Sequence, residues 1–82
     1  MSLRLHFRSP STGEYMSLDP GDCLVSEDGF HRVVNRGGTY VAEFNVTTTA
    51  KLSWCVVGHF DDFHEAWRAA DEAATETIKE ML

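Results

Sequence analysis

Apolar residues recur at helical spacing over the last part of the chain, and no Pro or Gly interrupts them between residues 63 and 82. Asp62 immediately precedes this run, and Glu65 lies three residues after Asp62, which is the spacing of a capping box at a helix N-terminus. The pattern predicts a helix over residues 63–81. The side chains that we expect this helix to bury are Phe63, Trp67, Ala70, Ala74 and Ile78.

The rest of the chain shows the two-residue alternation of β-strands. Leu3, Leu5 and Phe7, for example, alternate with basic or imidazole side chains. Turn sequences rich in Gly, Asp and Asn separate the apolar runs, and those at 27–29 and 35–38 have the spacing of tight reversals. The predicted strands cover residues 3–8, 23–26, 30–35, 39–46 and 51–57, with a brief extended segment at 14–18.

Strands joined by short connections are usually antiparallel neighbours. We therefore predict an α+β fold in a single domain over residues 1–82. An antiparallel meander of four to five strands forms one layer, and the C-terminal helix packs across one of its faces as the second. Because the buried stripe of the helix is mostly alanine, the sheet must supply bulky side chains. The residues expected to do so are Tyr40, Ala42, Phe44 and Val46, together with Leu52, Trp54 and Val56.

The negative charge of the chain is concentrated in the predicted helix. The net charge is −6 over 82 residues. Residues 59–82 contain two basic and seven acidic side chains, a net of −5, whereas residues 1–58 contain five basic and six acidic ones, a net of −1. A surface of this kind repels phosphate, so we do not expect the helix to contact nucleic acid.

Neither cysteine belongs to a C-x-x-C pair, and the first residues lack the apolar core of a signal peptide. No apolar run reaches the ~18 residues of a membrane-spanning helix. We therefore expect a cytoplasmic protein in which Cys23 and Cys55 are reduced and packed as small hydrophobic residues. A disulfide between them is the alternative.

No sequence motif for catalysis or cofactor binding is present. No Gly-rich loop precedes a helix, and no Ser or Cys stands in a nucleophile motif. His59 and His64 bracket two aspartates, but Asp62 is needed as the helix cap and His64 belongs to the outer helix face. His6 and His31 are expected at the surface. We predict no catalytic, cofactor-binding or metal-binding residues, and no cofactor.

Between residues 39 and 74, two strands lead into a G-x-F sequence, a helix cap and an E-A pair that opens an Ala-rich helix. This order resembles in layout the small three-strand-plus-helix domains at the start of phage-type integrases. The resemblance implies a sheet that grips DNA. The chain departs from that pattern, because residues 39–46 contain no Lys or Arg and residues 51–57 contain only Lys51.

The sequence favours a small, acidic, non-catalytic protein-interaction module, such as a regulator or inhibitor from a bacterium or mobile element, with an unidentified protein partner. If strand 3–8 lies beside strand 30–35, the sheet presents four arginines on one face; the acidic helix face is the other candidate surface. A nucleic-acid-binding domain that uses the arginines is one alternative. A small enzyme whose site forms on dimerisation is another, and the small size of the chain leaves homodimer formation open. The candidate surface residues are Arg4, Arg8, Arg32, Arg36, Glu72 and Glu76.

Overall fold

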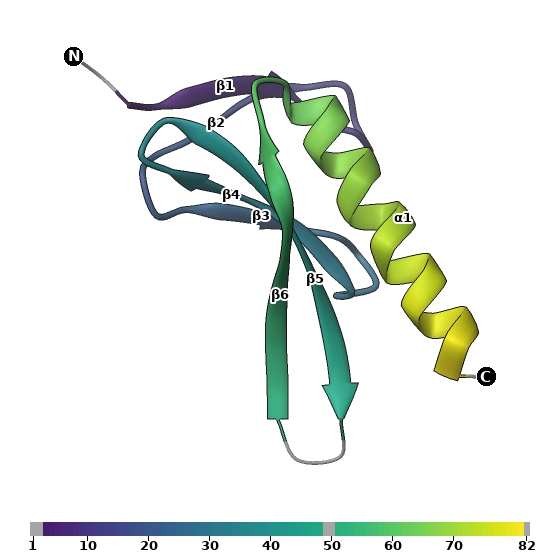
Figure 1. Cartoon of the computed structure of the whole chain (residues 1–82). Coiled ribbons are helices and arrows are strands. Elements are labelled where there is room, and N and C mark those ends of the chain that lie inside the picture. The colour runs from purple at the N-terminus through teal and green to yellow at the C-terminus, as the bar shows by residue number, and fades with distance from the viewer. Residues whose placement is uncertain (1–2, 49–50, 82) are drawn as a thin grey trace.

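The computed structural model describes residues 3–48 and 51–81. They form two antiparallel sheets and one C-terminal helix (Figure 1), so the predicted α+β fold is confirmed. The elements are β1 (Leu5–Arg8), β2 (Tyr15–Leu18), β3 (Cys23–Val25), β4 (His31–Arg36), β5 (Thr39–Thr48), β6 (Lys51–Phe60) and α1 (Phe63–Met81).

The larger sheet is a meander in which strands pair in chain order, β3-β4-β5-β6. Both predicted reversals are present. At the first, the carboxylate of Asp28 accepts hydrogen bonds from the Ser26 hydroxyl and the Phe30 amide. These bonds lower the pKa of Asp28. At the second, Gly37 and Gly38 both adopt positive φ, the conformation that a two-residue hairpin turn of this hand requires.

A β-bulge in β6 corrects the prediction of which side chains face the helix. The register between β5 and β6 shifts between Ala42 and Glu43, so that Val56 pairs with Glu43 and Trp54 pairs with Asn45. Residues directly opposite each other on paired strands have their side chains on the same sheet face. One extra residue in β6 therefore moves the side chains before the bulge to the other face. Trp54 and Val56 therefore point away from α1. The predicted roles of the Val46 and Leu52 side chains lie outside the described part of the structure.

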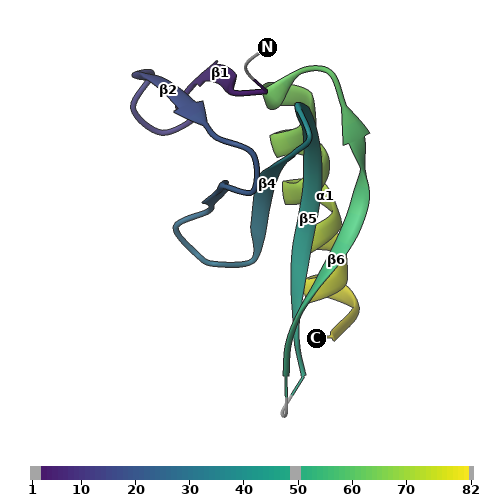
Figure 2. The same cartoon turned by 90° about the vertical axis from the view of Figure 1, so that its left-hand side faces the viewer.

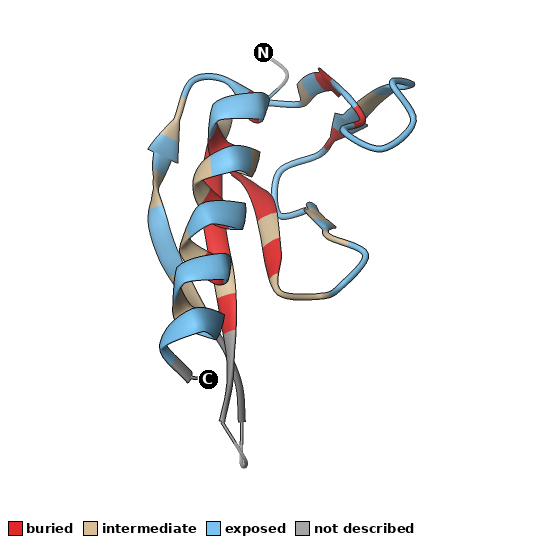
Figure 3. Ribbon diagram, turned by 90° about the vertical axis from the view of Figure 1, so that its right-hand side faces the viewer, coloured by how far each residue is buried: buried red, intermediate tan, exposed pale blue. Residues whose placement is uncertain are grey.

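The predicted helix is confirmed, and it covers one face of the larger sheet (Figure 3). The Glu65 amide donates to the carboxylate of Asp62 at 3.2 Å, as expected for an N-cap. The buried stripe ends at Ala74. Ile78, one turn further on, is 37% exposed, so the prediction that the helix buries it was wrong, and Trp67 packs against the core but is only half-buried. The helical residues in the core are Phe63, Ala66, Ala70 and Ala74.

The first predicted strand does not join the larger sheet. β1 pairs with β2, the segment for which the sequence predicts only a brief extension, in a separate two-stranded sheet (Figure 2). Aromatic and polar contacts attach this hairpin to the core. The ring of Phe7 stacks on Phe63 at 3.9 Å, and the hydroxyl of Tyr40 donates to the carbonyl of His6 at 2.8 Å. Burial is the main cause that raises the pKa of Tyr40, and the nearby Asp62 carboxylate adds to it.

Candidate functional site

Two of the four candidate arginines meet on the sheet face that points away from α1. Arg32 and Arg36 both pair with Glu43, at 2.6 and 3.1 Å, and the Glu43 side chain is only 2% exposed. The guanidinium of Arg32 also lies over the ring of Trp54, 4.1 Å from its centroid. Two positive charges thus surround one buried negative charge, which reduces the positive potential of this face.

The other two arginines lie on the β1–β2 hairpin. Arg4 pairs with Asp19 at 2.6 Å. Arg8 donates to the carbonyl of Gly13 and lies 5.9 Å from the Tyr15 ring centroid. The predicted surface with four arginines on one sheet requires strand 3–8 beside strand 30–35, and the structure does not pair these strands. The arginines therefore form no single anion-binding site.

The acidic face of α1 is more open to a partner. Glu72 and Glu76 are exposed, and neither carboxylate has an ion-pair partner among the residues that the structure describes. They line a shallow depression of about 270 Å³. Its other described lining residues are Asp71, Thr75 and Lys79.

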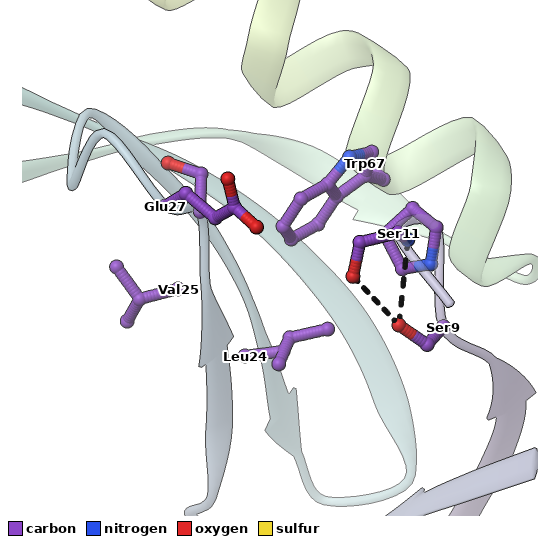
Figure 4. A pocket seen from close by; sticks show the side chains of 8 residues that line it. Ser9, Ser11, Leu24, Val25, Glu27 and Trp67 are labelled. Atoms are coloured by element: carbon purple, nitrogen blue, oxygen red, sulfur yellow. Dashed lines mark hydrogen bonds between the residues drawn. The ribbon is translucent and has the colours of Figure 1, made fainter. Parts of the chain in front are cut away.

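A second depression, which no sequence pattern predicts, lies at Trp67. It has a volume of about 180 Å³ and lies where α1 meets the β1–β2 turn and the β3–β4 hairpin (Figure 4). The indole of Trp67 forms one wall, and Glu27 is the charged residue among the described lining side chains. In the β1–β2 turn, the Ser9 hydroxyl is hydrogen-bonded to Ser11, which lies next to Trp67 in Figure 4. The described lining residues are Ser9, Pro10, Ser11, Leu24, Val25, Ser26, Glu27 and Trp67.

His31 links this pocket to the acidic helix face, and its burial corrects the prediction of a surface histidine. Its ring packs edge-on against Trp67 with centroids 4.6 Å apart. Among the residues that the structure describes, neither ring nitrogen has a hydrogen-bond partner, and Nδ1 lies 3.9 Å from an Asp71 carboxylate oxygen. Asp71 follows Trp67 by one helical turn and also lines the depression at Glu72 and Glu76, so it lies between the two depressions.

We call the surface that runs from the Trp67 pocket over Asp71 to the outward face of α1 the acidic flank: Glu27, Trp67, Asp71, Glu72 and Glu76. The flank combines a partly exposed indole with carboxylates. A cation over the face of a tryptophan is attracted by the ring, and carboxylates bind guanidinium or ammonium groups through charge-assisted hydrogen bonds. The chemistry of the flank therefore suits a cationic side chain.

The remaining candidate residues form no chemical centre in the described part of the chain. Cys23 is exposed, which corrects the prediction that it is packed, whereas Cys55 is half-buried, and both are free thiols. Within residues 3–48 and 51–81, no three His, Cys, Asp or Glu side chains are placed to hold a metal ion. In the same ranges, no helix is both long and apolar enough to cross a membrane.

Comparisons with known proteins give no relative from which a function could be transferred. No family model, curated protein or solved structure matches the chain.

Proposed function

We propose that this chain is a non-catalytic protein-interaction module whose acidic flank binds a basic segment of a partner protein. The observation that carries the proposal is the Trp67 pocket, which has the carboxylate of Glu27 in its wall and lies one helical turn from Asp71, where the depression lined by Glu72 and Glu76 begins. An aromatic side chain within an otherwise polar rim is typical of the residue that dominates a protein interface.

The charge distribution supports a basic partner over nucleic acid. Residues 59–82 carry a net charge of −5 from two basic and seven acidic side chains. On the opposite side of the sheet, the carboxylate of Glu43 is shared by Arg32 and Arg36. A phosphate backbone would therefore meet repulsion at the helix and partly neutralised arginines at the sheet.

Exposed ion pairs alone contribute little, typically about 0–1 kcal/mol each in water. We therefore assign most of the binding energy to the Trp67 pocket, where the indole would cover an arginine or lysine side chain. The carboxylates of Glu72 and Glu76 would mainly accelerate association and orient the basic segment. This division predicts that Trp67→Ala leaves the association rate constant unchanged and raises the dissociation rate constant of the complex.

The test is capture of proteins from the native host by the immobilised chain, quantified by mass spectrometry. We expect a reproducible set of basic proteins that is lost with Trp67→Ala and with Glu72→Lys/Glu76→Lys. The charge-matched control is Asp22→Lys/Asp61→Lys, which changes two exposed carboxylates away from the flank. Partners that bind equally to all four proteins would refute the acidic flank as the site.

A titration with duplex DNA tests the main alternative. The proposal expects no salt-sensitive binding by the wild-type chain. Micromolar binding that weakens steeply with salt would instead support nucleic-acid recognition through the arginine-bearing sheet.

A further inference from the structure

The larger sheet has two edges of very different length. The order β3-β4-β5-β6 makes β3 and β6 the edge strands. β3 has three residues, whereas β6 has ten. Residues 52–56 of β6 contain no charged side chain and no Pro, and the bulge lies beyond them, between Val56 and Gly58, so this stretch of the long edge is regular and uncharged.

Hydrogen bonds elsewhere in the sheet show which backbone groups of β6 face this open edge. The Asn45 amide donates to the Phe30 carbonyl at 2.8 Å, so the backbone of Asn45 is directed toward β4. In an antiparallel ladder, bonding to the two sides alternates along the strand. Trp54 lies opposite Asn45, and Val56 lies opposite Glu43 two residues earlier in β5. The N–H and C=O groups of Trp54 and Val56 therefore point away from β5.

We propose that a second copy of this chain pairs antiparallel with β6 along this edge, which joins two four-stranded sheets across a two-fold axis. An antiparallel copy presents the same outward donors and acceptors in reverse order, so one contact satisfies the edges of both chains. Trp54 and Val56 of each copy would lie on the same sheet face, where aromatic and β-branched side chains pair favourably across strands.

The distribution of charge favours a copy of the same chain at this edge. The net charge of −5 on residues 59–82 belongs to α1 and the turn before it, and no carboxylate occurs in β6. Two copies can therefore pair along β6 without placing like charges directly opposite each other. Pairing also buries surface that a chain of 82 residues cannot cover by itself.

The other sheet edge provides a matched control. The Ser26 amide donates to His31, and the Asn35 amide donates to Asp22, so residues 22 and 26 are directed toward β4. By the same alternation, Val25 between them directs its N–H to the open edge of β3. Val25 and Val56 are thus exposed valines, 42% and 57% accessible, with outward N–H groups on opposite edges.

The experiment measures the oligomeric state by sedimentation and by light scattering over the micromolar range. We expect a dimer for the wild type and for Val25→Pro, and a monomer with an unchanged circular dichroism spectrum for Val56→Pro. Proline removes only an outward donor at these positions. Loss of one hydrogen bond from each copy should raise the dissociation constant about 30-fold.

A second pair of variants keeps the test decisive if proline perturbs folding. Lysine on an edge strand discourages pairing without removing a hydrogen bond, so Val56→Lys should be monomeric and Val25→Lys dimeric. A monomeric wild type, or a dimer that survives both changes at Val56, would overturn the proposal. Glu72→Lys/Glu76→Lys should remain dimeric, so this result is independent of whether the acidic flank binds a partner. Loss of the dimer in Glu72→Lys/Glu76→Lys would also contradict pairing at β6.

Discussion

The guanidinium of Arg32 lies 2.6 Å from the carboxylate of Glu43, which is buried near the middle of the sheet face that points away from α1. The two residues face each other directly across β4 and β5. Arg36 pairs with the second oxygen of the same carboxylate, and the ring of Trp54 lies over Arg32. Side chains from β4, β5 and β6 thus connect three strands through one buried charge.

Glu43→Gln should therefore destabilise the fold, because it leaves the charge of Arg32 without its buried partner. We expect a loss of about 3 kcal/mol in the free energy of unfolding, measured by urea denaturation. Glu72→Gln is the control, since this exposed carboxylate has no partner in the described structure and should change stability by less than about 0.5 kcal/mol. Equal effects of the two substitutions would show that the Glu43 cluster is not stabilising.

Phe63→Ala should be among the most damaging substitutions in the helix. Its side chain is fully buried and stacks on Phe7 and Trp67. Removal should cost about 3–5 kcal/mol, whereas Ile78→Ala should cost about 1 kcal/mol because Ile78 lies at the exposed edge of the helix. Thermal unfolding of both variants checks the ranking. A larger effect at Ile78 would mean that the helix is rotated about its axis relative to the structure.

Tyr40→Phe should remove a hydrogen bond to the β1–β2 hairpin and lower stability by about 1 kcal/mol at neutral pH. The pKa of Tyr40 is raised in the folded state by burial and by Asp62. The folded state therefore holds the phenol proton more tightly than the unfolded state. The stability that this tighter proton binding contributes is fully present below the unfolded tyrosine pKa of about 10. It is lost as the pH rises through the pKa of Tyr40 in the folded state.

Urea denaturation at pH 7 and above pH ~10 checks this linkage. The stability difference between wild type and Tyr40→Phe should narrow at alkaline pH. Tyr15→Phe is the control: Tyr15 is 69% exposed and donates no hydrogen bond in the described structure, and its charge is the smallest of the three causes that raise the pKa of Tyr40, so its removal should change stability little. A difference that stays constant with pH would refute the role of the Tyr40 proton.

The helix and the order of the larger sheet were predictable from the sequence because local signals determine them. Asp62 and Glu65 mark the start of α1, and glycines at 29, 37 and 38 mark the two hairpin turns. Pairing of the first strand was not predictable in the same way. Both β2 and β4 offer it an antiparallel partner, and the contacts that place the hairpin come from distant segments, such as the Phe7 ring on Phe63 and the Tyr40 hydroxyl on the His6 carbonyl.

The bulge in β6 explains the errors about Trp54 and Val56. Without the extra residue, Val56 would pair with Phe44 and face the helix, as the alternation predicts. The bulge instead places Trp54 beside Arg32 on the other face. A polar residue at Glu43 within an apolar strand was the available signal for an ion pair. The Trp67 pocket had no comparable signal, because its walls come from three distant segments.

The two thiols should differ in reactivity, because the structure exposes Cys23 and half-buries Cys55. Cys23 belongs to the short edge strand β3, whereas Cys55 lies opposite Phe44 within the long β5–β6 ladder. We expect a thiol reagent to label one site rapidly in the folded protein and the second only slowly, as local opening permits. Cys23→Ser should abolish the rapid phase, and Cys55→Ser should preserve it. Rapid labelling of both thiols in the wild type would show that the central part of β6 opens readily, which would also argue against its pairing with a second copy.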